Sequence, residues 1–457
     1  MSTLLIKNGQ IINHDHSFQA NIFIRDQKIE KLFSPEEETP EAEKILDAKG
    51  KMIFPGAIDA HVHLDLPTPA GPSSDNFYTG TQAAIAGGTT SIIDFVTPNR
   101  NESLLKALNK RRKDAEKSLI DYSFHMGITW WNNSVEEEIA ECIRQGITSF
   151  KCYLAYQNSI GINYQQLEKI MNAVQKQGGI VTVHCEEDEL IQNLKQVYLK
   201  QGLVSPLYHA LSRPPQSEYL SVEKVLKLAE KTSCKTYLVH ISTRKSAELI
   251  ENAQLKGVNV LAETCPQYLL LDESVYHSSF YESAPYVISP PIRGKYDQDG
   301  LWSAINRNVF SVIATDHCPF NVHGQKDAGR YNFSLIPNGA GGIEFRQQLI
   351  YSYGIQSGRM NLNQFVALTA SNPASIFGIQ RKGRITEGYD ADLVLWNPET
   401  IRIIEKETQY QHCDSNIFHN FALKGEAETV IIGGKIGYNH HQFSPEQPNG
   451  NELFRKI

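Results

Sequence analysis

Short apolar runs alternate with helix-like segments through most of this 457-residue chain. The segments between the runs, such as residues 103–119 and 163–177, place apolar side chains at the three- and four-residue spacing of a helix face. Eight strands that alternate with helices favour an α/β fold in which a parallel sheet closes into a (β/α)8 (TIM) barrel. The runs cover residues 56–61, 89–95, 122–128, 147–153, 179–184, 236–241, 258–264 and 309–316.

The two ends of the chain show a different pattern. Residues 1–54 and 379–457 contain short stretches typical of strands, with turn residues such as Asn8 and Gly9 between them. We therefore expect a barrel of residues 55–378 and one small β-sandwich domain that is assembled from both termini.

Charge and cysteine content narrow the class of protein. The 44 basic and 51 acidic residues give a net charge of −7, which offers no reason to expect nucleic acid or an anionic membrane as a partner. No apolar run approaches the roughly 20 residues that cross a bilayer, and the first residues lack the pattern of a signal peptide. The seven cysteines are dispersed and odd in number, which indicates reduced thiols in a cytoplasmic protein.

Potential metal ligands follow five of the eight runs. In a barrel of this kind, the C-terminal ends of the strands meet at one face, where catalytic groups collect. Histidine and aspartate there are typical ligands of a divalent metal. The residues are His61, His63, Lys151, His184, His240 and Asp316.

Five other histidines are interpreted as surface residues. They lie in polar or proline-rich segments rather than at the end of a run, and solvated histidines are common there. They are His14, His16, His209, His440 and His441.

Lys151 is an unusual member of the ligand set. An ammonium group has three donors and no acceptor, so it cannot bind a cation. A carbamate formed from the neutral amine and CO2 carries a negative charge and two oxygens, and it could join two metals. The simpler alternative is a lysine that pairs with a nearby carboxylate.

The order of several motifs resembles that of dihydropyrimidinases and bacterial D-hydantoinases, which belong to the amidohydrolase superfamily. The resemblance spans essentially the whole chain. It rests on DAHVHLDLP, AGGTTSIIDF, GITSFKCYLAY, IVTVHCEED, YLVHIS, YVISPPIR, ATDHCPF and IPNGAGGIE.

The resemblance implies a centre of two divalent ions, with zinc expected, joined by N6-carboxylated Lys151 and a hydroxide. One metal would be held by His61, His63 and Asp316, and the other by His184 and His240. It also implies a homo-oligomer, commonly a tetramer.

The implied reaction is hydrolysis of a cyclic amide C–N bond in a dihydropyrimidine or hydantoin ring, which yields an N-carbamoyl amino acid. The partner is then a small cyclic amide, which the metal-bridging hydroxide attacks. Asp316 would carry the proton to the leaving nitrogen, and Tyr156 would bind the oxyanion. Ser289 and Asn338 would contact the ring through their main chains.

Several alternatives stay open at this point. An allantoinase would use the same metal chemistry on a different ring. A dihydroorotase usually has an arginine just after the two histidines, where this chain has Leu64 and Asp65. A deaminase with one metal has no need for Lys151. A non-catalytic scaffold related to dihydropyrimidinases would have lost ligands, whereas all six candidates are present here.

Two loops are expected to shape the pocket for the ring substituent. They are residues 66–76 and the segment that follows Tyr156, residues 157–163. The first contains three prolines and departs from the apolar loop of many hydantoinases, so the substrate itself is not identified.

Overall fold

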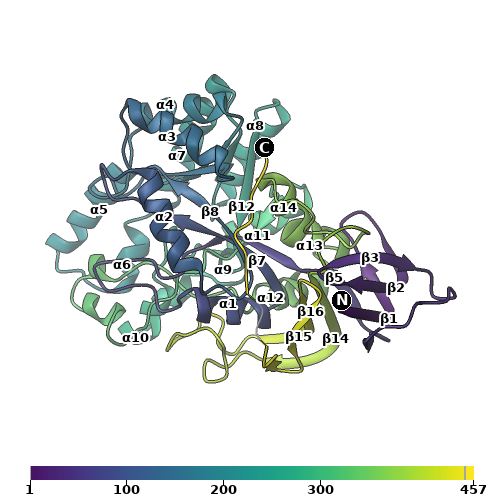
Figure 1. The fold of residues 1–457 in the computed structure, drawn as a ribbon. Helices are drawn as coiled ribbons and strands as arrows, with labels where there is room; N and C mark the ends of the chain where they lie inside the picture. The colour runs from purple at the N-terminus through teal and green to yellow at the C-terminus, as the bar shows by residue number, and fades with distance from the viewer. Residues whose placement is uncertain (1, 447–448) are drawn as a thin grey trace.

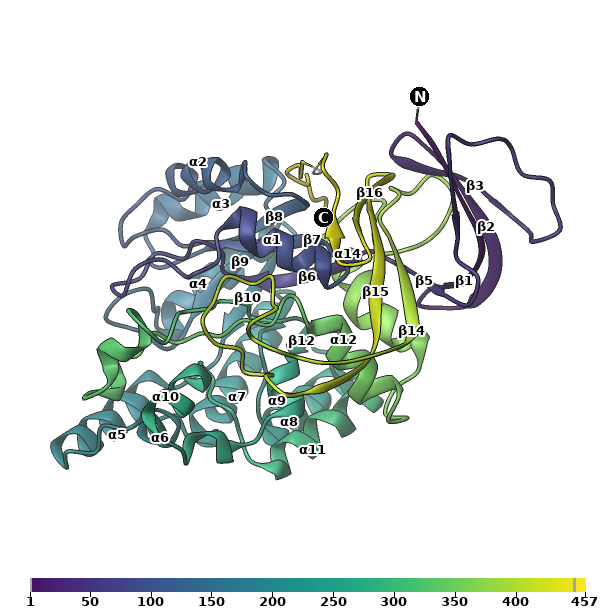
Figure 2. The ribbon, with the colours of Figure 1, turned by 90° about the horizontal axis from the view of Figure 1, so that it is seen from below.

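A closed ring of eight parallel strands occupies the middle of the molecule (Figures 1 and 2). The computed structural model describes residues 2–446 and 449–457. Every predicted run overlaps one strand, and a parallel bridge between Val62 and His317 joins the last strand region to the first. The strands are β6 (Ala57–Val62), β7 (Thr89–Val96), β8 (Asp121–Gly127), β9 (Ser149–Tyr153), β10 (Ile180–His184), β11 (Thr236–Leu238), β12 (Val260–Thr264) and β13 (Val312–Ile313). The barrel expected from the sequence is confirmed.

Helices surround this ring (Figure 1). None of the helices in the described part of the chain is both long and apolar enough to span a membrane. Those between the strands are α1 (Phe77–Ala86), α2 (Leu104–Ala115), α3 (Asn133–Arg144), α4 (Tyr164–Lys176), α7 (Pro215–Thr232), α8 (Arg244–Leu255) and α11 (Lys295–Asn306). The other α-helices are α5 (Asp188–Lys200), α6 (Pro206–Leu211), α9 (Pro266–Leu270), α10 (Phe280–Ser283), α12 (Arg346–Ile350), α13 (Leu362–Val366) and α14 (Asn372–Phe377).

Helix α4 illustrates how the local sequence sets these elements. The Asn163 side chain accepts from the Gln166 amide at 2.9 Å, and the Gln166 side chain accepts from the Asn163 amide at 3.1 Å. This reciprocal capping satisfies donors that a helix start leaves unpaired. The buried Leu167, Met171 and Val174 follow at helical spacing and pack toward the strands.

Strands from both termini form a second sheet. β5 pairs with β14 in antiparallel register, with Leu393 opposite Pro55, so the two ends of the chain meet there. The strands are β1 (Thr3–Ile12), β2 (Ser17–Arg25), β3 (Lys28–Phe33), β4 (Lys44–Asp47), β5 (Met52–Pro55), β14 (Leu393–Ile403), β15 (Ala422–Ile432), β16 (Lys435–Asn439) and β17 (Gln442–Phe443). The expected β-rich unit built from both termini is present as one nine-stranded sheet. The division of the chain after residues 54 and 378 stays a prediction.

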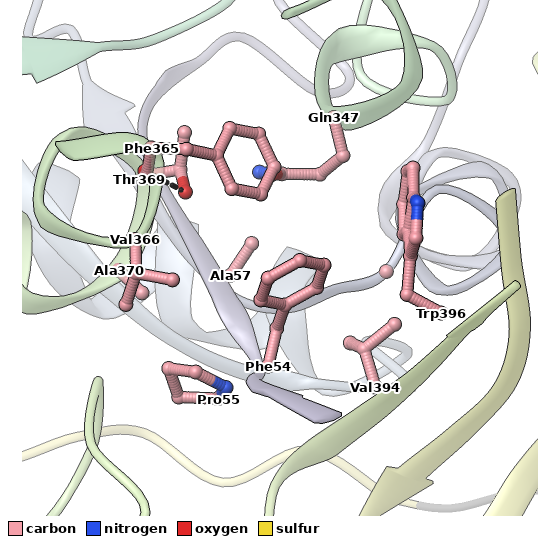
Figure 3. A pocket seen from close by; sticks show the side chains of 11 residues that line it. Phe54, Pro55, Ala57, Gln347, Phe365, Val366, Thr369, Ala370, Val394 and Trp396 are labelled. Carbon is pink, nitrogen blue, oxygen red and sulfur yellow. Dashed lines mark hydrogen bonds between the residues drawn. The ribbon is translucent and has the colours of Figure 1, made fainter. Parts of the chain in front are cut away.

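A small apolar pocket marks the seam between the terminal sheet and the barrel (Figure 3). Phe54 lies edge-on to Phe365 and Trp396, with ring centroids 5.3 and 5.8 Å apart. The pocket has a volume of about 10 Å³, which is room for one water molecule at most. The pocket is therefore a packing seam and offers no room for a ligand.

The C-terminal segment closes the barrel at the end where the strands begin. Leu453 donates its amide to the Tyr122 carbonyl at 2.7 Å. The Arg455 side chain is 1% exposed and donates to Ser149 Oγ at 2.8 Å and to the Phe124 carbonyl. The opposite end, where the strands finish, is left for the candidate site.

Candidate metal centre and substrate pocket

The six predicted ligands line one cavity of about 640 Å³ at the C-terminal ends of the barrel strands. His61 lies in β6 and His63 just after it, Lys151 lies in β9, and His184 ends β10. His240 follows β11 by two residues and Asp316 follows β13 by three. Five of the six are buried, and the Asp316 side chain is 18% exposed.

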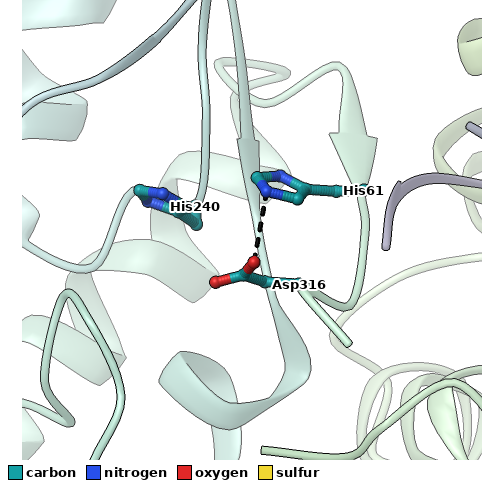
Figure 4. A group of neighbouring side chains, drawn as sticks. All are labelled: His61, His240 and Asp316. Atoms are coloured by element: carbon teal, nitrogen blue, oxygen red, sulfur yellow. Dashed lines mark ion pairs between the residues drawn. The ribbon is translucent and has the colours of Figure 1, made fainter. Parts of the chain in front are cut away.

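The imidazoles and the carboxylate face one another across this cavity. Asp316 Oδ1 lies 3.1 Å from His61 Nε2 and 3.2 Å from His63 Nε2. His184 Nδ1 lies 3.0 Å from His240 Nε2. One ligand atom each from His61, His240 and Asp316 lies within 4.8 Å of the others, and Figure 4 shows these side chains from separate elements turned toward one another.

Two carboxylates hold the outer nitrogens of two of these imidazoles. Glu263 Oε1 contacts His61 Nδ1, and Glu186 Oε2 lies 2.8 Å from His184 Nε2. Each contact fixes the ring so that its other nitrogen faces the cavity. His61 Nε2 is buried and, among the described residues, makes its 3.1 Å contact with Asp316 without the geometry of a hydrogen bond, so the donor set fits a cation.

Both carboxylates are themselves anchored. Glu263 lies in β12, the barrel strand next to the one that leads to Asp316, and its Oε2 accepts from the Tyr237 hydroxyl at 2.8 Å. Arg213 donates to Glu186; burial alone would raise the pKa of Glu186, but Arg213 and His184 outweigh it and lower the pKa to about 2. Sequence reasoning missed both residues, although each acidic residue occurs at or just after the end of a strand.

The position of Asp316 is held by the next residue in the chain, His317. Asp316 has a φ of 55°, a strained value for a residue with a side chain. The following residue, His317, bonds Asp75 through Nε2 at 3.0 Å and accepts the Gly342 amide at Nδ1. Burial alone would raise the pKa of Asp316, but His61 and its neighbours hold it well below the usual value, so the side chain is a carboxylate.

Lys151 is 1% exposed and lies over the rings of Phe95 and Tyr153 at 5.0 and 5.1 Å. Burial lowers its pKa to about 8, against the opposing charges of Asp316 and Glu263. Among the described residues, no carboxylate lies within 4.0 Å of its Nζ. The alternative of a lysine in a close ion pair is therefore not what the structure shows.

Tyr156, Ser289 and Asn338 line the same cavity. Tyr156 has a φ of 64°, its amide donates to Asp188 at 2.9 Å, and its ring centroid lies 5.6 Å from that of His184. In the part of the chain that the structure describes, no hydrogen bond engages the main chain of Ser289 or Asn338. Those main-chain groups are free to pair with a ligand.

The two predicted loops also reach this cavity. Residues 66–70 of the first loop and Ser159 and Ile160 of the second are in its wall. Leu66, Pro67 and Pro69 make the first loop's contribution mainly apolar.

The surface assignment of His209 is wrong. His209 is 4% exposed, and its Nε2 donates to the Ile288 carbonyl at 2.8 Å. Burial and the nearby Arg213 lower its pKa to about 3, so the ring is neutral. The other four histidines lie outside the cavity, and the side chains of His16, His440 and His441 are 56–66% exposed.

Comparison with known proteins gives a consistent result. The model of the Amidohydrolase family matches residues 52–437. The D-hydantoinase of Geobacillus stearothermophilus is 39% identical over 444 residues, which cover 96% of this chain and 94% of the relative. The dihydropyrimidinase of Dictyostelium discoideum is 36% identical over 482 residues, covering 100% of this chain and 95% of the relative. The crystal structure of a dihydropyrimidinase from Brevibacillus agri has a TM-score of 0.97 at 37% identity and covers 99% of both chains.

The barrel, the ring of ligands and these matches define the class: the chain belongs to the amidohydrolase family. Within that family, the relatives that it resembles along its full length include proteins named D-hydantoinase and dihydropyrimidinase.

Proposed function

We propose that this protein hydrolyses the cyclic amide C–N bond of a dihydropyrimidine or hydantoin ring and releases an N-carbamoyl amino acid. One observation carries the proposal. Six candidate ligands line a single cavity together with Ser289 and Asn338, whose main-chain groups have no hydrogen-bond partner among the described residues, in a chain with full-length relatives named D-hydantoinase and dihydropyrimidinase.

The donor set suits two divalent ions, and zinc is the expected metal because imidazole and carboxylate are its usual ligands. His61, His63 and Asp316 would hold one ion, and His184 and His240 the other. Lys151, carboxylated on its amine, would join them, and its burial without a close carboxylate supports this role. When bound, such a pair of ions lowers the pKa of a shared water and polarises a carbonyl.

The residues of the chain then bind the ring and move the proton. The main chains of Ser289 and Asn338 pair with the alternating N–H and C=O groups of the ring. The Tyr156 hydroxyl donates to the oxygen that becomes negative during attack. Asp316 Oδ1 faces two imidazoles, so Oδ2 is the oxygen that takes the proton of water and delivers it to the leaving ring nitrogen. The hydroxide of the water thereby bonds to the carbonyl carbon, its proton goes to the ring nitrogen, and no other reactant is consumed.

We also propose that the protein works as a homotetramer in the cytoplasm. The seven cysteines are free thiols, which is consistent with a reducing compartment. Light scattering on the purified protein measures the number of subunits directly.

A turnover screen tests the proposed reaction. The substrates are dihydrouracil, hydantoin, 5-substituted hydantoins, allantoin and dihydroorotate, with divalent metal and bicarbonate supplied. We expect ring opening of dihydrouracil or a hydantoin. Turnover of allantoin alone would replace the proposal with an allantoinase, and turnover of none of them would favour a non-catalytic relative.

A further inference from the structure

Lys326 is a buried lysine in the short turn η3 (Lys326–Gly329) beside the cavity, and it is 1% exposed. Its ammonium donates to three main-chain carbonyls, those of Val287 at 3.0 Å, Pro337 at 3.2 Å and Gly339 at 2.8 Å. No carboxylate within the described ranges lies within 4.0 Å of its Nζ. All three donors of the ammonium therefore serve the backbone.

These carbonyls belong to the two segments that present Ser289 and Asn338. Pro337 and Gly339 flank Asn338 on both sides, and Val287 lies two residues before Ser289. The Gly339 amide also donates to the Val287 carbonyl at 3.0 Å, so the two segments touch at this point. Lys326 thus links the segments next to their unpaired main-chain groups.

Other buried side chains hold the first segment in the same way. Tyr276 donates to the Tyr286 carbonyl at 2.9 Å, and His209 donates to the Ile288 carbonyl at 2.8 Å. Lys326 differs from both because it alone of the three also bonds the second segment.

We propose that Lys326 is a positioning residue for ring recognition, which holds the two segments at the spacing that lets Ser289 and Asn338 pair with the same ring. This inference rests on the proposed function. Lys326 is not part of the cavity wall, so it acts through the backbone and not by touching the substrate.

Burying the charge of Lys326 costs free energy, which argues that the side chain has a specific role. Burial lowers the pKa of Lys326 to about 7, although Cys413, Cys318 and Asp414 act in the opposite direction. An apolar side chain would avoid the free-energy cost of burying a charge, but it would leave three carbonyls without their donor.

The test compares Lys326→Met and Lys326→Gln with the wild type, each prepared with divalent metal and bicarbonate. We measure KM and kcat on the best substrate of the screen, metal content, and hydrogen exchange in peptides that contain residues 286–290 and 336–340. For Lys326→Met we expect KM to rise about tenfold or more with kcat within about threefold, because binding of the ring weakens equally in ground and transition states. Exchange protection should fall in both segments while metal content stays unchanged. Lys326→Gln, with two N–H donors, should give an intermediate KM.

The matched control is Lys235→Met. Lys235 is half-buried before β11, and its ammonium donates to a single carbonyl, that of Ile376, at 3.3 Å. Its loss should leave KM unchanged.

A KM within about twofold of the wild type in Lys326→Met would overturn the inference. If that variant does not fold, the same result in Lys326→Gln would overturn it. A parallel loss of kcat and bound metal with normal exchange protection would also overturn it, because the effect would then lie at the metal centre. A wild-type protein that opens no cyclic amide would instead contradict the proposed function before any variant is compared.

Discussion

At the scale of single residues, the carboxylates behind the imidazoles determine which nitrogen faces the cavity. Glu263 and Glu186 each bond an outer ring nitrogen, so the inner nitrogens of His61 and His184 point at the centre. A neutral imidazole has one donor and one acceptor nitrogen, and such a partner selects between them. Both rings are thus held in the orientation that the proposed metal binding would require.

Asp316→Asn tests the proposed proton carrier. The amide keeps the size of the side chain but cannot take up the proton, so we expect kcat to fall by about 10²–10⁴-fold. Thermal melting should stay near that of the wild type. Asp65→Asn is the matched control, since Asp65 lies near the same face but outside the cavity wall, and it should retain turnover. Near-normal turnover in Asp316→Asn would mean that another group carries the proton.

The sequence allowed the six candidate ligands to be singled out because each lies at or near the end of a strand, which is a local pattern, and the structure brings all six to one cavity. The sequence did not identify Glu263, which contacts His61 across 202 positions, or Lys326, whose role depends on carbonyls of other segments. His209 was assigned to the surface because its partner, Ile288, is 79 residues away. Pairings of this kind exist only after the chain has folded.

At the scale of elements, the strands determine where the site lies, and the connections after them determine its shape. Strand β13 has two residues and yet leads to Asp316, because the adjacent β12 and the bridge from Val62 to His317 hold it in register. Helices α5 and α6, which follow β10, bring His209 against Ile288, the residue before Ser289. Periodicity predicted the strands and main helices, but short helices such as α6 and α9 carry too few turns for a pattern to appear.

The C-terminal segment provides a prediction at this scale. Arg455→Ala removes a buried side chain that donates to β8 and β9, and we expect unfolding to become easier by about 2–4 kcal/mol. Because Arg455 lies at the opposite end of the barrel from the cavity, KM should not change. Urea unfolding and steady-state kinetics measure the two effects. The exposed Lys456 serves as the control through Lys456→Ala, and equal stability of the two variants would show that the segment does not anchor the barrel.

At the scale of the whole molecule, the contacts that stabilise the barrel and the cavity proposed for catalysis lie in different places. The terminal sheet packs against the barrel through the seam at Phe54, the C-terminal segment closes one end of the barrel, and the other end carries the six candidate ligands. The alternation of runs and helices predicted this arrangement, and the β-rich ends predicted the second sheet. How those ends meet, through Leu393 beside Pro55, could not be predicted because nothing local in either segment specifies a partner so far along the chain.

The central claim is that six side chains from five strands hold a pair of cations joined through Lys151. Elemental analysis of protein prepared with bicarbonate, combined with turnover, tests it most directly. We predict about two divalent ions per chain in the active wild type. We also predict loss of both turnover and bound metal in Lys151→Ala, with partial recovery when a short carboxylate replaces the bridge. Full activity with one ion or none, or unchanged turnover in Lys151→Ala, would contradict the account.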